Sequence, residues 1–164
     1  MVCLLAGAVS NATAISVVPA SMNPGEPVAI SVTDLPDGSK CSIRLAGSFS
    51  VAPGGDYVFG VSEFVMPFSL NNGAVTAKAA NTQYNVLSVQ KDDTEVRATG
   101  ISTNDQFTVT KPMAIPQGTY DSVLLAGTAA ANATRVDAEL DITGTKQGPK
   151  DSTIRFFIDG IEEG

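Results

Sequence analysis

The sequence predicts an all-β protein built as an antiparallel β-sandwich of about nine to ten strands. Alternation is the main observation: residues 136–142 are apolar at every second position, with Asp137, Glu139 and Asp141 between them. Turn-forming clusters of Pro, Gly, Asn and Asp interrupt the chain at intervals of roughly 12–20 residues. No long segment has helical periodicity, and 164 residues suffice for one domain with its own core.

The clearest part of the pattern runs from Ile115 to Thr143. Pro116-Gln117-Gly118 predicts a turn, and a strand at 120–125 follows it. Leu124 and Leu125 are adjacent in this strand, which indicates that both of its faces are covered.

The other expected strands lie at 17–19, 28–32, 41–49, 57–70, 74–79, 84–90, 95–101, 107–110, 136–142 and 153–159. Asn71-Asn72-Gly73 predicts a hairpin turn. Pro67 lacks an N–H, so its strand is expected to lie at a sheet edge or to contain a bulge. The core is expected to contain Leu45, Leu125, Leu140 and Phe156.

The first residues have a different character. An apolar run from Val2 is followed by Ala12-Thr13-Ala14, which is similar to a secretory signal with its cleavage site. The run is short and lacks a positive start, so we interpret 1–14 as a truncated signal peptide and 15–164 as the domain. The alternative is that the run forms a first β-strand.

The two halves of the chain share a sequence echo. Leu35–Gly47 aligns with Ile115–Gly127 at an offset of 80 residues, with Pro, Gly, Ser, Leu, Ala and Gly matching. This indicates either an internal duplication or a turn-and-strand unit that sandwiches reuse.

Two segments carry a family resemblance. Val17–Val32 resembles the first two strands of immunoglobulin-like β-sandwich modules in prokaryotic cell-surface and secreted proteins, and Pro116–Val123 resembles their late Gly-x-Tyr strand. The resemblance implies an immunoglobulin-like sandwich with extra strands. It also implies that Gly118 and Tyr120 are structural residues, with the Tyr120 hydroxyl bonded to backbone as in a tyrosine corner. The chain lacks the Trp and the cysteine pair of antibody domains.

Composition excludes several classes of function. The chain has no histidine, which removes histidine-based catalytic triads and histidine metal sites. A net charge of −7 argues against nucleic-acid partners, and the apolar run is too short to span a membrane. Cys41 falls on the inward face of its strand and is expected to be a buried hydrophobe; the alternative is an intermolecular disulfide.

Carboxylates are the remaining reactive groups. Asp137, Glu139 and Asp141 share one strand face at spacings of about 7 Å, and Asp92, Asp93 and Glu95 form a second acidic group. Calcium would relieve the repulsion within either group, and it is the one cofactor that the sequence suggests. The alternative is a solvated polar face. Separately, Asn132-Ala133-Thr134 is a glycosylation sequon in an expected loop.

These observations favour a non-enzymatic, secreted or cell-surface structural or interaction module, of the sheath, surface-layer, filament or adhesin type. Its expected partner is a protein, or a second copy joined at a sheet edge through a segment such as Ile15–Val18. The alternatives are a glycan-binding or calcium-dependent adhesion module and, less favoured, a carboxylate-dependent hydrolase. The absence of Trp and the few tyrosines weaken a sugar-stacking platform.

Overall fold

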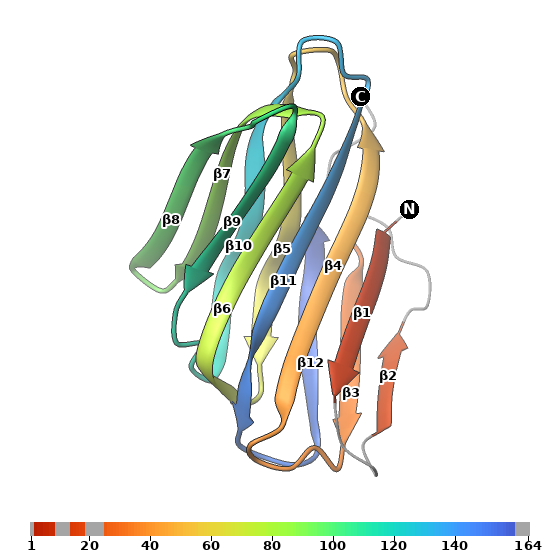
Figure 1. Cartoon of the computed structure of the whole chain (residues 1–164). Helices are drawn as coiled ribbons and strands as arrows, with labels where there is room; N and C mark the ends of the chain where they lie inside the picture. Colours follow the sequence, from red (N-terminus) through yellow and green to blue (C-terminus); the bar gives the residue numbers. More distant parts are fainter. Residues whose placement is uncertain (1, 9–13, 19–24, 160–164) are drawn as a thin grey trace.

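The computed structural model describes residues 2–8, 14–18 and 25–159, and this part of the chain contains strands and turns but no helix. Figure 1 shows two layers of antiparallel strands packed face to face. The five-stranded sheet has the order β1-β4-β11-β6-β9, and the seven-stranded sheet has the order β2-β3-β12-β5-β10-β7-β8. The strands are β1 (Val2–Ala8), β2 (Ala14–Val18), β3 (Pro27–Thr33), β4 (Lys40–Ser50), β5 (Asp56–Met66), β6 (Ser69–Ala80), β7 (Thr82–Lys91), β8 (Thr94–Ile101), β9 (Gln106–Pro112), β10 (Gly118–Ala129), β11 (Arg135–Gln147) and β12 (Ser152–Asp159). The predicted all-β sandwich is confirmed, with ten strands, β3–β12, from Pro27 onward.

The core lies between the two sheets and follows the predicted alternation. On β11 the odd-numbered residues from Asp137 to Thr143 face outward, whereas Val136, Ala138, Leu140 and Ile142 are buried. Leu140 pairs in register with Leu45 of β4, and Leu125 and Phe156 approach the same interior from the other sheet. All four expected core residues are therefore buried in one cluster.

One predicted turn is wrong. Asn71-Asn72-Gly73 lies inside β6, and the chain turns instead at Pro67-Phe68, between β5 and β6. Pro67 cannot donate to a strand ladder, which makes it a natural strand end. Asn72 has a φ of 50°, and the pairing of β6 with β11 shifts register between Thr143 and Thr145, so the Asn-Asn-Gly stretch forms a bulge.

The expected bond from the Tyr120 hydroxyl to the backbone is confirmed. The Tyr120 hydroxyl donates a hydrogen bond of 2.9 Å to the Pro116 carbonyl, and burial raises the pKa of Tyr120 to about 12. Gly118 has a φ of +144°, a conformation that residues with a Cβ rarely adopt. The two echo segments occupy comparable places, since each is a turn that leads into a long strand, β4 in one sheet and β10 in the other. Their duplication stays a prediction.

The first two strands cover sheet edges on one side of the sandwich. Within the segment interpreted as a signal peptide, Val2–Ala8 forms β1 and pairs with β4, as in the alternative of a first strand. Ala14–Val18 pairs with β3 of the same chain. Residues 12 and 13 of the expected cleavage site lie outside the described residues, and cleavage itself stays a prediction.

A buried lysine, Lys146, joins two loops at one end of the sandwich. Lys146 is 1% exposed, and its Nζ donates to the carbonyl of Leu35 at 2.7 Å, to that of Gly148 at 2.5 Å, and to Asp37 Oδ1 at 3.1 Å. The Gly148 N–H also donates to Asp37, and this bond, with the Lys146 ammonium, lowers the pKa of Asp37. The arrangement ties the β3–β4 loop to the β11–β12 loop.

Leu125→Ala is expected to lower the free energy of unfolding by about 2–5 kcal/mol, because a fully buried leucine would leave a cavity. Ile101→Ala is the control: its side chain is 77% exposed, so the change should stay within about 0.5 kcal/mol. Urea unfolding measures both. A loss below about 0.5 kcal/mol for Leu125→Ala would contradict the packing described here.

Lys146→Met is expected to cost about 1.5–3 kcal/mol, because the buried carbonyls of Leu35 and Gly148 lose a charged donor. Lys78→Met removes the same charge from an exposed position on β6 and should be nearly neutral. The comparison uses thermal and urea unfolding of the two variants. Equal stability of the two variants would show that Lys146 does not stabilise the protein by joining the two loops.

Candidate functional site

The two outer faces of the sandwich differ in chemistry, and the first of them is polar. The outer face of the five-stranded sheet holds serines, threonines, small residues and ion pairs. A shallow depression of about 570 Å³ lies over β4, β11, β6 and β9. Polar side chains contribute much of its lining: Ser48, Lys78, Gln106, Thr108, Arg135, Asp137 and Glu139.

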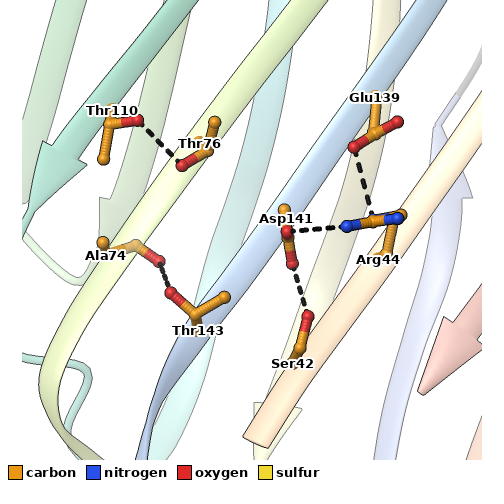
Figure 2. A network of polar contacts seen from close by, with 8 residues as sticks. All are labelled: Ser42, Arg44, Ala74, Thr76, Thr110, Glu139, Asp141 and Thr143. Carbon is orange, nitrogen blue, oxygen red and sulfur yellow. Dashed lines mark hydrogen bonds and ion pairs between the residues drawn. The ribbon is translucent and has the colours of Figure 1, made fainter. Parts of the chain in front are cut away.

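Arg44 is the centre of one charged network on this face. Figure 2 shows its guanidinium between two carboxylates of β11, with Nε 3.3 Å from Glu139 Oε1 and Nη2 3.4 Å from Asp141 Oδ2. Ser42 Oγ donates to Asp141 Oδ1 at 2.7 Å. β4 therefore supplies positive charge and a hydroxyl donor to the carboxylates of its neighbour.

Arg135 forms the second network. Its Nη2 lies 2.8 Å from Asp137 Oδ1, and its other contacts include Ser48, whose hydroxyl also donates to Asp137. Partial burial acts to raise the pKa of Asp137, but the hydrogen bonds from Ser48 and Arg135 and the arginine's charge outweigh it and lower the pKa. Asp137 is therefore an ionised hydrogen-bond acceptor, whereas a general acid needs a raised pKa.

This geometry bears on the calcium expectation, which stays a prediction. Over the residues that the structure describes, no group of three or more acidic or cysteine side chains is placed to hold an ion. Arg44 and Arg135 already relieve the repulsion among Asp137, Glu139 and Asp141.

The members of the second acidic group have separate partners. Asp92, in the β7–β8 turn, pairs with Lys91 at 3.2 Å. Glu95 accepts a bond of 2.7 Å from Ser88, and neither contact involves Asp93.

The other outer face carries exposed apolar side chains. In the described part of the chain the exposed large hydrophobic residues are Val58, Tyr84, Ile101 and Phe157, and alternation places all of them on the outer face of the seven-stranded sheet. Half-buried Leu124, Ala126 and Val86 lie among them. We call these seven residues the apolar strip.

Strand pairing makes most of the strip continuous. Ala126 of β10 pairs with Val58 of β5 on one side and with Val86 of β7 on the other, while Tyr84 pairs with Ile101 of β8. Leu124 lies over Gly60, where an added Cβ would come within 3.0 Å of its Cδ2. Phe157 stands beside this area on β12, in register with Ser62.

Sequence reasoning missed the strip apart from one signal. Adjacent Leu124 and Leu125 indicated that both faces of their strand are covered; Leu125 is in the core, and Leu124 lies half-buried on the outside. Apart from the β7–β8 hairpin, the members belong to strands that are not neighbours in sequence, so their convergence depends on sheet order.

Two further sites fall where the sequence placed them. Cys41 is buried, and burial raises the pKa of its thiol to about 11, which agrees with a core role and disfavours disulfide exchange. Asn132 is exposed in the loop between β10 and β11, where a glycan could be attached. Its glycosylation stays a prediction. Within the described ranges the structure has no helix that could cross a membrane.

Comparisons with known proteins show likenesses in shape. No family model and no curated protein matches the sequence. One similar solved structure comes from a study of the promiscuous specificity of carbohydrate-binding modules of the β-sandwich superfamily, with 14% identity and a TM-score of 0.41 over 97% of this chain. The chain spans 57% of that structure. The enzymatically active domain of tailspike protein 4 of bacteriophage CBA120 is similar at 9% identity and a TM-score of 0.31, over 98% of this chain and 19% of that one.

Excess EDTA is expected to leave the melting temperature unchanged, because arginines rather than an ion neutralise the β11 carboxylates. Calorimetry with EDTA, with added calcium and with neither measures this. Arg44→Met is the sensitised variant, since it restores repulsion between Glu139 and Asp141. A fall in the melting temperature of the unmodified protein with EDTA, reversed by added calcium, would instead show a calcium site.

Proposed function

We propose that the chain is a non-enzymatic structural or interaction module of an extracellular, cell-surface assembly, and that it contacts neighbouring protein through the apolar strip. The observation that carries the proposal is the clustering of Val58, Tyr84, Ile101 and Phe157 on one face. Soluble monomers rarely expose large contiguous apolar patches, and such patches mark contact surfaces. The polar face opposite supplies the solvated surface that such a module also needs.

The non-enzymatic part of the proposal has its own support. The chain has no histidine, and Asp137, Glu139 and Asp141 all make ion pairs with Arg44 or Arg135, which, with Ser48, lowers the pKa of Asp137. Paired-carboxylate hydrolysis needs one carboxyl group that retains its proton. The extracellular location is supported by the resemblance to surface modules and by the exposed sequon at Asn132.

A second candidate function is glycan binding in the depression over β4, β11, β6 and β9. The specific observation is its combination of Arg135, Asp137, Glu139, Lys78 and Gln106, which are side chains able to bond sugar hydroxyls. No exposed aromatic ring lines the depression, because Phe107 is buried. A glycan would bind there by hydrogen bonds alone, so this function is placed second.

Hydroxyl-radical footprinting tests the primary proposal on native material. The protein is labelled in intact cells and, separately, as the purified chain. We expect Tyr84 and Phe157 to be several-fold less oxidised in cells, because the strip is covered there. Lys111 and Pro112, exposed on the rim strand β9, serve as internal controls. Equal oxidation of Tyr84 and Phe157 in both samples, or no labelling of the chain outside the cell, would contradict the proposal.

A further inference from the structure

We propose that β8 is a pairing edge for a second copy of this chain, with the two β8 strands antiparallel about a two-fold axis at Val96. The inference rests on the proposed function and names a second copy as the partner of the sheet edge that borders the apolar strip. In such a pair the seven-stranded sheets of two copies would join into one continuous sheet. The two strips would then lie on the same outer face.

The first observation is that β8 is an open and regular edge. It is the last strand of its sheet, and Figure 1 shows it at the margin. Its pairing with β7 runs without a register shift from Tyr84↔Ile101 to Lys91↔Thr94. It contains no proline, whereas the rim strand β9 ends in Lys111-Pro112. Proteins usually block sheet edges with bulges, prolines or charged side chains, especially lysines; β8 has no bulge, proline or lysine, and its two charges, Glu95 and Arg97, have opposite signs.

The second observation is charge complementarity along this edge. Glu95 and Arg97 face outward on β8, next to each other on the same side of the sheet. In an antiparallel pair centred on Val96, Glu95 of each copy is opposite Arg97 of the other, which gives two equivalent ion pairs. Moving the centre by one residue in either direction places Glu95 opposite Glu95, or Arg97 opposite Arg97. Like charges directly opposite disfavour those registers.

The state of the two charges in the single chain agrees with this register. Glu95 accepts a hydrogen bond from Ser88, which holds its carboxylate over the β7–β8 surface. Within the part of the chain that the structure describes, Arg97 has no ion-pair or hydrogen-bond partner. The second copy would supply a carboxylate to this guanidinium without breaking an existing ion pair.

The third observation is apolar. Ile101 is 77% exposed at the end of β8, beside half-exposed Tyr84. In the register centred on Val96 the two β8 strands overlap from Thr94 to Ala98, and Ile101 lies just beyond the paired segment, on the same outer face. A two-fold contact of this kind closes as a dimer. The dimer would be the unit that enters the larger assembly.

Charge reversal tests the register. Sedimentation equilibrium would measure the dimer dissociation constant of the wild type, of Glu95→Arg and of Arg97→Glu. Each single variant places like charges opposite each other twice, and we expect its dimer to weaken roughly tenfold or more. Lys111→Glu makes a matched charge change on β9 and should leave the constant unchanged. Circular dichroism checks that all variants remain folded.

Two rescue samples make the test specific. An equimolar mixture of Glu95→Arg and Arg97→Glu pairs opposite charges at both positions, and the double variant E95R/R97E does so within one sequence. Both are expected to restore dimerisation. The β8 proposal would be overturned if the charge reversals left the dimer dissociation constant unchanged. It would also be overturned if the wild type stayed monomeric at millimolar concentration. Neither result bears on the footprinting of Tyr84 and Phe157, which tests the proposed function separately.

Discussion

The fold depends on the period of two along its strands. Each long strand must turn one set of alternate side chains toward the interior between the sheets, and the two layers hold together only if all of these sets agree. A slip of one residue between β11 and β4 would expose Leu140 and bury the carboxylates beside it. The arginines would not follow, because Arg44 faces Asp141 only in the native register. The ion pairs are therefore weak contacts that nevertheless select the correct pairing.

Much of this could be predicted from the sequence because alternation is local. Strands such as 136–142 and 84–90 were located from their pattern, and the Tyr120 hydroxyl bond followed from one short motif. The error at Asn71-Asn72-Gly73 arose where two local signals competed. Pro67 ends the preceding strand, so the turn lies there. The residues Asn71-Asn72-Gly73 form a bulge opposite β11 instead of a turn.

The candidate sites were less accessible to such reasoning, because they depend on which strands become neighbours. Asp137, Glu139 and Asp141 were recognised as one acidic face. Two of them are neutralised by Arg44, which lies 97 positions before Asp141 in the chain. The apolar strip draws on β5, β7, β8, β10 and β12. No segment of the sequence contains enough of it to distinguish an exposed patch from core.

The place of β12 also has a consequence for how the molecule is made. This strand, Ser152–Asp159, lies between β3 and β5, and β3 reaches the rest of its sheet only through it. During synthesis, most strands of the sandwich therefore leave the ribosome before β12, the strand that joins the β2–β3 unit to the rest of its sheet, has been made. Until residues 152–159 emerge, the flank of β5 is an open strand edge, and a nascent chain is most vulnerable to mispairing in that interval. The seven-stranded sheet is therefore completed only when β12 pairs between β3 and β5.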